Sequence, residues 1–215
     1  METAVVWTSL AIMDDDGETT TLDPDAQLML RFKAGDLEAF EALFARHARA
    51  VVNFAFRFVR NRDVAEELAQ EVFLKVHDAA RSYRPEARFT TWLYRIATNV
   101  CLNEVRRPYF RAVHETLDSV LSADPDGKPM PLADRGNAGP AAGLERQAIA
   151  LALRRALEQL PEKQRLAFIL NKYQELSYGE VAEVMKISEK AVKSLIHRAK
   201  EAMADRLRPL LPGLL

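Results

Sequence analysis

A stretch rich in proline and glycine divides the sequence and limits what the chain can fold into. Residues 108–143 hold five of the ten prolines and four of the eight glycines, without a sustained helical period of apolar residues. Helices and strands rarely keep such residues in their interiors, so this stretch is predicted to be a flexible linker. The chain should therefore form two separate folding units.

The blocks on either side of this linker carry the residue spacing of amphipathic helices. In residues 23–107 an apolar stripe recurs at helical spacing, and residues 144–215 repeat this pattern. The clearest part of the stripe consists of Leu37, Phe40, Leu43, Phe44, Val51, Phe54 and Phe58. The predicted fold class is all-α, with two small helical domains joined by the linker.

Capping residues predict where these helices begin. In the first block the predicted caps are Asp23 before Pro24, Asp36 after Gly35, and Asp63 with Glu66. In the second block they are Ser177 with Glu180, and Ser188. Only the three residues 186–188 separate the last two helices, which predicts a helix-turn-helix.

The last predicted helix has two chemically different faces. At 100° per residue its apolar side chains fall between about 200° and 300° from Lys193, and its basic and polar side chains fall on the opposite side. The inward set is Val192, Leu195, Ile196, Ala199 and Met203, and the outward set includes Lys190, Lys193, Ser194, His197 and Arg198. These donors suit a helix in the DNA major groove, while a merely solvated amphipathic helix is the alternative.

Charge is distributed unevenly along the chain. The net charge is −1, but residues 1–26 carry seven acids and no base, whereas 27–107 carry 14 bases and 10 acids. Residues 144–215 carry 13 bases and nine acids, and the linker carries three bases and five acids. Two mildly basic blocks are compatible with a phosphate-backbone partner, although they also fit an ordinary solvated surface. Residues 1–22 are predicted to be a flexible acidic extension.

Several classes of protein are not expected. Cys101 is the only cysteine, which excludes a disulfide framework and a cysteine-based metal site. No signal peptide and no run of about 18 apolar residues is found, so a cytoplasmic protein without membrane insertion is predicted. The four histidines lie on different predicted elements and no glycine-rich phosphate loop occurs, so neither a cofactor nor an enzyme active site is expected.

Three motifs stand in order along the two blocks: Asp63–Phe73, Thr91–Asn99 and Leu160–Ala199. Together they closely resemble the extracytoplasmic-function sigma factors of bacterial RNA polymerase. The resemblance covers about residues 24–107 and 144–210 and excludes the N-terminal extension. It implies that residues 23–107 are sigma region 2 and that residues 144–215 are sigma region 4 with its helix-turn-helix.

The resemblance implies that the first motif docks on the clamp helices of the polymerase's largest subunit. The matching residues are Glu67, Leu68, Gln70, Glu71 and Phe73. Carboxylates repel phosphates, so acidic and amide groups suit a protein partner better than DNA. Taken without the resemblance, the acids are better explained as helix N-terminal charges that favour the helix dipole.

In the same family the segment from Tyr83 to Arg107 reads and melts the minus-ten promoter element. Tyr83 and Asn99 match positions that line a pocket for a base flipped out of the stack. The candidates for contact with the strand backbone are Arg95, Arg106 and Arg107. Trp92 is either a stacking platform for a base or a core residue.

For the minus-thirty-five element, the family uses positions that match Lys193, Ser194, His197 and Arg198, and Lys190 shares their face. The sequence here is Ala-Val-Lys-Ser-Leu over residues 191–195, instead of the commoner Thr-Val-Arg-Ser-Arg. Lysine cannot make the planar bidentate contact of arginine with guanine. General attraction to DNA is therefore expected, while the preferred base sequence stays open.

The implied function is that of a promoter-specificity subunit, with catalysis left to the polymerase. Its expected partners are core RNA polymerase, through the clamp helices and the flap of the second-largest subunit, promoter DNA, and an anti-sigma factor. Two alternatives remain from the residues alone. One is a helix-turn-helix regulator that binds DNA without polymerase, and the other is a protein-interaction adaptor whose basic faces are incidental.

Overall fold

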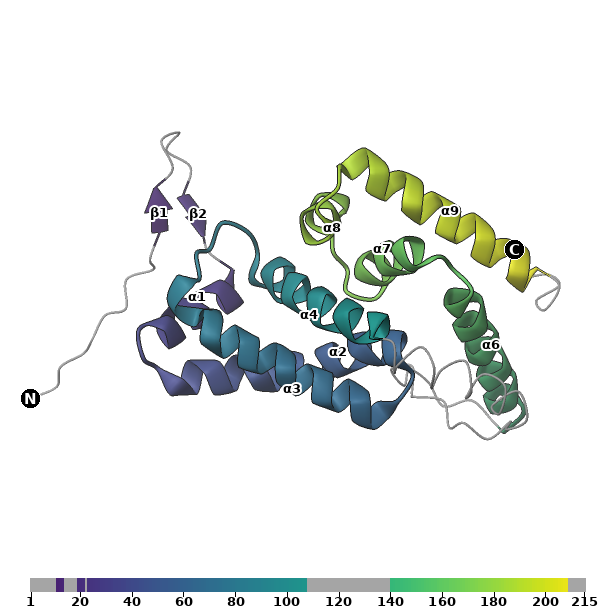
Figure 1. Cartoon of the computed structure of the whole chain (residues 1–215), viewed down its shortest axis with the longest axis horizontal. Coiled ribbons are helices and arrows are strands. Elements are labelled where there is room, and N and C mark those ends of the chain that lie inside the picture. The colour runs from purple at the N-terminus through teal and green to yellow at the C-terminus, as the bar shows by residue number, and fades with distance from the viewer. Residues whose placement is uncertain (1–10, 14–18, 22, 108–139, 209–215) are drawn as a thin grey trace, which may run out of the picture. The chain divides into compact units, whose positions relative to one another are not determined.

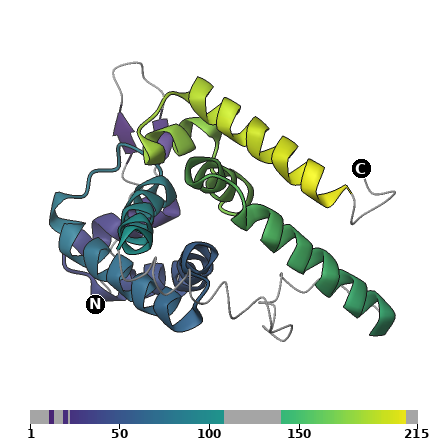
Figure 2. The same cartoon turned by 45° about the vertical axis from the view of Figure 1, so that its right-hand side comes forward.

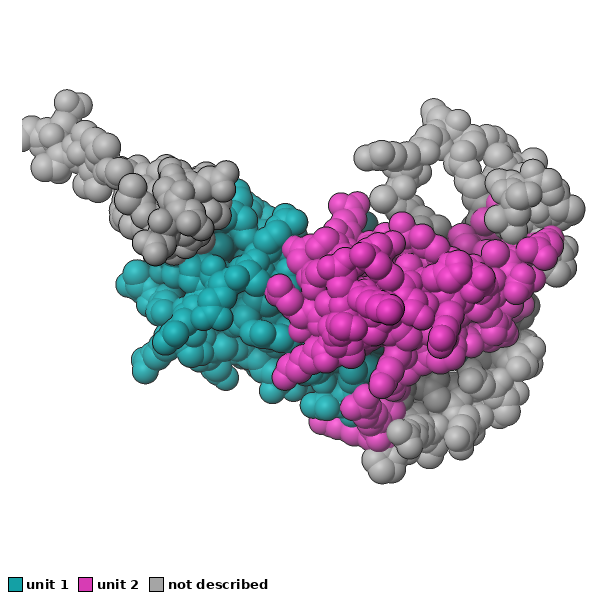
Figure 3. All heavy atoms as spheres, turned by 90° about the horizontal axis from the view of Figure 1, so that it is seen from above, with its two compact units in different colours: residues 1–104 teal, residues 105–215 magenta. Residues whose placement is uncertain are grey.

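A computed structural model describes residues 11–13, 19–21, 23–107 and 140–208, with side chains from 149 onward in the last range. The chain divides into two compact units, residues 1–104 and 105–215, which Figure 3 colours separately. Each unit has its own helices and its own set of buried apolar side chains.

Among the residues that the structure describes, the first unit contains four α-helices (Figure 1). They are α1 (Pro24–Lys33), α2 (Leu37–Val59), α3 (Arg62–Ala79) and α4 (Phe89–Arg106). A short 3₁₀ turn, Ala80–Ser82, follows α3 directly. The predicted all-α class is confirmed for residues 23–107.

The first two helices begin and end where the capping residues predict. The Ala26 amide donates to Asp23 Oδ1 over 2.8 Å, and the Ala39 amide donates to Asp36 Oδ1 over 3.3 Å. Gly35 adopts a φ of 104°, a conformation that glycine reaches without the steric cost of a Cβ. The chain therefore reverses between α1 and α2 in only three residues.

The start of α3 lies upstream of the predicted cap. Asn61, not Asp63, is the cap, because its Oδ1 accepts from the Val64 amide over 3.1 Å. Asp63 falls in the first turn, where its charge still favours the helix dipole. A capping side chain accepts from the amide three residues further along the chain. Asn61 and Asp63 are both of a residue type that can do this, so the spacing alone does not distinguish them.

The core of the first unit confirms most of the predicted stripe on α2. Val51, Phe54 and Phe58 are buried, and the Phe54 ring lies 5.2 Å from the Tyr94 ring of α4. Leu37 is exposed instead, and Phe44 is partly exposed although its ring lies 4.8 Å from the Phe73 ring of α3.

The second unit contains α6 (Pro140–Glu158), α7 (Glu162–Lys172), α8 (Tyr178–Met185) and α9 (Glu189–Leu207). Helix α9 packs on the other three, as Figures 1 and 2 show from two sides. Helix α6 includes the last four residues of the predicted linker, 140–143. Its first residue is Pro140, whose fixed φ suits the first turn of a helix.

The predicted helix-turn-helix is present as α8, a short turn and α9. Both hydrogen bonds of the capping box form: the Glu180 amide donates to Ser177 Oγ, and the Ser177 amide donates to the Glu180 carboxylate. The Ala191 amide donates to Ser188 Oγ at the start of α9. Between these helices Lys186 adopts a left-handed φ of 55°.

A short ribbon occurs in the segment predicted to be a flexible extension. Strand β1 (Ala11–Met13) pairs antiparallel with β2 (Thr19–Thr21). Other residues of 1–22, the linker up to residue 139, and residues 209–215 lie outside the described residues. In the described ranges, no helix is both long enough and apolar enough to span a membrane.

Replacing Lys186 with glycine is predicted to stabilise the second unit by about 0.5 to 1 kcal/mol. Glycine removes the clash between Cβ and backbone at positive φ, which outweighs the entropy it adds to the unfolded chain. The matched control is Lys200→Gly, an exposed position inside α9, where the same change should destabilise by about 0.7 kcal/mol. Native-state hydrogen exchange of buried α9 amides measures both changes in the free energy of unfolding. If both substitutions changed this free energy in the same direction, the explanation from positive φ would be wrong.

Candidate polymerase-binding and DNA-binding faces

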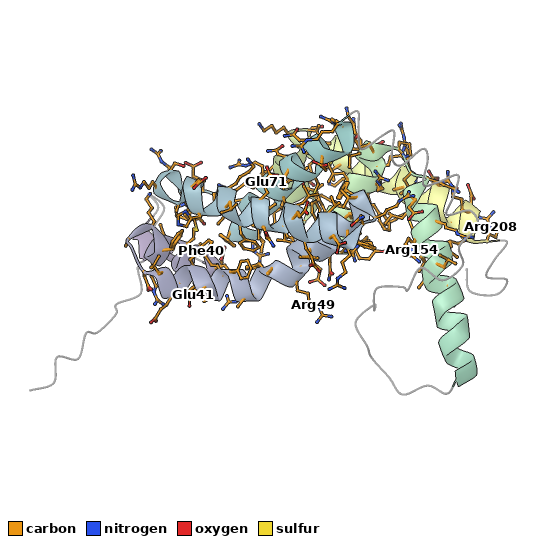
Figure 4. The ribbon with its side chains drawn as sticks, turned by 60° about the horizontal axis from the view of Figure 1, so that its bottom comes forward. Phe40, Glu41, Arg49, Glu71, Arg154 and Arg208 are labelled. Carbon is orange, nitrogen blue, oxygen red and sulfur yellow. The ribbon has the colours of Figure 1, made fainter. Side chains whose placement is uncertain are left out.

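The outward side of α3 carries an acidic and amide stripe that ends in an exposed leucine. Glu67, Gln70, Glu71 and Leu74 follow the i, i+3, i+4, i+7 spacing of one helix face, and Glu71 is labelled in Figure 4. The side chain of Leu74 is 65% exposed, while Glu71 forms an ion pair of 3.3 Å with Lys75. These four residues are called the α3 stripe.

Leu68 and Phe73 do not belong to this exposed stripe. Both are buried, and the Phe73 ring lies 4.8 Å from the Phe44 ring of α2. The sequence assigns them to a partner surface, but the turn of the helix points them into the domain core. Leu74, which the sequence analysis missed, is the apolar residue left outside. Its position four residues after Gln70 and three residues after Glu71 is the signal that identifies it.

Helix α4 presents a polar and basic outward face. Arg95, Asn99 and Arg106 are exposed and share that face, and Arg107 follows at the end of the helix. Asn103, which the sequence analysis did not select, is exposed on the same face. Trp92 is half-buried, so one part of its ring stays accessible next to Arg95.

Tyr83 is a core residue in this structure. Its side chain is 2% exposed, and its ring packs 5.0 Å from Trp92 and 6.4 Å from Phe89. Burial, followed by the charges of Asp23 and Asp25, raises the pKa of the Tyr83 phenol to about 12. A buried ring has no open face for a base, so the predicted role of Tyr83 in a base pocket does not fit its position; it supports Trp92 from beneath.

The inward side of α4 fixes the orientation of its outward face. Leu93, Ala97 and Cys101 are fully enclosed. Burial, followed by the charge of Glu71, raises the pKa of the Cys101 thiol to about 12. The thiol therefore stays protonated and acts as a small apolar side chain.

Helix α9 separates its two faces as the angle count predicts. Val192, Ile196, Ala199 and Met203 are buried, and Leu195 is half-buried. All of the predicted DNA-contacting residues are exposed: Lys190, Lys193, Ser194, His197 and Arg198.

Two of these residues are already paired along the helix. Lys193 Nζ lies 2.8 Å from Glu189 Oε1 and 5.9 Å from the centre of the Tyr178 ring in α8. The hydrogen bond with Glu189 raises the pKa of Lys193, which keeps the ammonium charged. His197 Nε2 lies 3.4 Å from Glu201 Oε1. Both pairs are exposed, so DNA phosphates can replace the carboxylates at little cost.

Both domains match family models of sigma factors. Residues 43–108 match Sigma-70 region 2, and residues 150–203 match Sigma-70 region 4. The RNA polymerase sigma-H factor of Pseudomonas aeruginosa is 33% identical over 195 residues, which cover 89% of this chain and 97% of that protein. The ECF RNA polymerase sigma-E factor of Escherichia coli K12 is 32% identical over 191 residues, covering 87% of this chain and 96% of that protein.

This chain is an extracytoplasmic-function sigma factor. The family membership sets aside both the free-standing DNA-binding regulator and the interaction adaptor. As a sigma factor, the chain belongs to the specificity subunits that act in transcription initiation.

Solved structures share the fold of this sigma factor. CnrH, in complex with the cytosolic domain of CnrY, matches with a TM-score of 0.63 and 24% identity, over 87% of this chain and 99% of that chain. The sigma factor RpoE from Bartonella quintana, in complex with the anti-sigma factor NepR, matches with a TM-score of 0.58 and 22% identity, over 79% of this chain and 96% of that chain.

Proposed function

We propose that this sigma factor docks on the clamp helices of the largest polymerase subunit through the α3 stripe. The exposed Leu74 beside Glu67, Gln70 and Glu71 is the single observation that carries the proposal. An apolar anchor surrounded by polar groups is the usual composition of a protein interface, where the buried anchor supplies most of the affinity. Two carboxylates also disfavour DNA as the partner of this face.

The double variant Glu67→Ala with Leu74→Ala is expected to weaken binding to core RNA polymerase by at least about tenfold, because it removes an anchor and a charged contact. The measurement is the Kd of the full-length protein for purified core enzyme.

The chain offers a control of the same chemistry on another helix. Leu37 is 66% exposed and Glu41 lies on the same helix, α2 (Figure 4). Leu37→Ala with Glu41→Ala removes an equal leucine and an equal charge, and its Kd should stay within about twofold of the unmodified protein. Similar losses in both double variants would contradict the assignment to α3.

For the minus-ten element, we propose that the outward face of α4 contacts the melted strand. Asn99 supplies an amide that can read the edge of an exposed base, and Trp92 supplies the accessible part of an aromatic ring. Arg95, Arg106 and Arg107 supply positive charge for the strand backbone. Tyr83 acts only as a support for Trp92, because it is buried.

For the minus-thirty-five element, we propose that α9 enters the major groove with its exposed face. Ser194 and His197 lie nearest the base edges, and Lys190, Lys193 and Arg198 neutralise phosphates. We assign contact with the flap of the second-largest polymerase subunit to the same region-4 domain.

Removing one phosphate contact should lower the salt dependence of DNA binding. For Lys193→Ala, the slope of log affinity against log salt concentration should fall by about one, because one fewer counterion is released. Lys163→Ala is the control, since Lys163 is exposed on α7 outside the proposed face and should leave the slope unchanged. The probe is duplex DNA selected by the wild-type holoenzyme from a randomised pool. An unchanged slope for Lys193→Ala would show that Lys193 does not contact a DNA phosphate.

We also propose that an anti-sigma protein controls this sigma factor by covering its polymerase-binding surface. The similar RpoE structure is a complex of a sigma factor with an anti-sigma factor, which supports this proposal. The chain purified from non-inducing cells should carry such a protein, and that protein should compete with core polymerase for the chain in a binding assay. A co-purified protein that binds together with core polymerase, or no such protein, would count against the proposal.

A further inference from the structure

Helix α1 contacts both ends of the segment that joins the 3₁₀ turn to α4. The Phe89 amide donates a hydrogen bond to Asp23 Oδ2 over 3.0 Å. Lys33 Nζ donates to the Tyr83 carbonyl oxygen over 2.8 Å. These partners lie 66 and 50 residues apart in the chain, so they are tertiary contacts rather than local turns. The N-terminal end of α1 therefore binds the end of the segment, at Phe89, and the C-terminal end of α1 binds its beginning, at Tyr83.

Asp23 serves two helices with one carboxylate. Its Oδ1 accepts from the Ala26 amide and caps α1, while its Oδ2 accepts from Phe89, the first residue of α4. The first amides of a helix have no partner within that helix, so an outside acceptor is needed to satisfy them. A charged acceptor also makes a stronger hydrogen bond than a neutral one. The direction in which α4 leaves the segment thus depends on α1.

Helix α1 is itself held firmly against α2. Asp25 Oδ2 lies 2.8 Å from Nε2 of the buried His47, and Asp25 Oδ1 pairs with Arg46. Met29 and Phe32 are buried, and the Phe32 ring packs 4.6 Å from the Phe40 ring. Because α1 is fixed along its length, its position relative to the domain core is constant. The residues of segment 83–89 that α1 binds are therefore also fixed relative to the core.

We propose that α1 is a positioning element for minus-ten recognition, with Asp23 and Lys33 as its positioning residues. The inference rests on the proposed function of the α4 face, whose first accessible residue, Trp92, lies within one turn of Phe89. Helix α1 lies outside residues 43–108, which match Sigma-70 region 2. Its role is to hold segment 83–89 at both ends, so that Trp92 and Asn99 meet the displaced base in a fixed geometry, without contacting the DNA itself.

The test uses holoenzyme assembled from core polymerase and full-length sigma variants. The probe is a short single DNA strand that the wild-type holoenzyme selects from a randomised pool. The second probe is the same strand with one base removed. The abasic site stands at the position where removal of the base weakens binding of the wild-type holoenzyme most. The ratio of the two affinities measures base capture, and it is insensitive to the amount of folded protein and to backbone attraction.

Two variants each break one of the contacts. Asp23→Asn keeps one oxygen for the α1 cap and places an amide donor against the Phe89 amide, while Lys33→Met keeps the apolar stem and removes the ammonium. Each is expected to lower the intact-to-abasic affinity ratio by about tenfold and to leave core binding unchanged. Lys33→Arg should restore the ratio. Asp36→Asn is the matched control, because Asp36 also caps a helix but pairs with Arg31 rather than with segment 83–89.

The outcomes separate this inference from the proposed function. If Asp23→Asn and Lys33→Met keep the wild-type ratio, α1 has no positioning role, while the assignment of the α4 face stands. If wild-type holoenzyme does not distinguish the two strands, the α4 face does not capture a base, and both proposals fail. Hydrogen exchange at the Phe89 amide provides a second measurement, since it should accelerate in Asp23→Asn; if Asp23→Asn does not fold, the Lys33→Met and Lys33→Arg pair decides alone.

Discussion

Burial of one apolar face per helix is the interaction on which the rest of the structure depends. A helix turns through 100° per residue, so burying Leu68 and Val72 of α3 forces Glu67, Gln70 and Leu74 outward. The same geometry encloses Cys101 in α4 and leaves Asn99 exposed. The faces that we propose for polymerase and DNA are therefore determined by the core, and a substitution in the core would rotate or loosen such a face without touching it.

Local sequence signals predict the fold closely because the helices begin at short-range hydrogen bonds. Asp23, Asp36, Ser177 and Ser188 each accept from an amide three residues on, as their positions predict. The faces of α9 follow from residue spacing alone for the same reason. Where two residues close in sequence satisfy the same spacing, as Asn61 and Asp63 do at the start of α3, the pattern cannot choose between them.

The candidate site is less predictable, because it depends on contacts between distant segments. Motif matching groups Leu68 and Phe73 with the partner surface, yet packing against α2 buries them and leaves Leu74 outside. Tyr83 begins a loop-like sequence, but it is buried, and its ring packs 5.0 Å from the Trp92 ring. The hydrogen bond between Asp23 and Phe89 spans 66 residues, and nothing in the sequence around either residue predicts that the two are in contact. Only the tertiary structure brings these residues together.

Above all, we propose that the outward face of α3 meets the polymerase. Photo-crosslinking tests it most directly: a benzoylphenylalanine residue replaces Leu74 in one protein and the equally exposed Leu37 in another, and each is irradiated in complex with core enzyme. We expect a strong crosslink from position 74 to the largest subunit and little or none from position 37. Efficient crosslinking from position 37 with none from position 74 would contradict it.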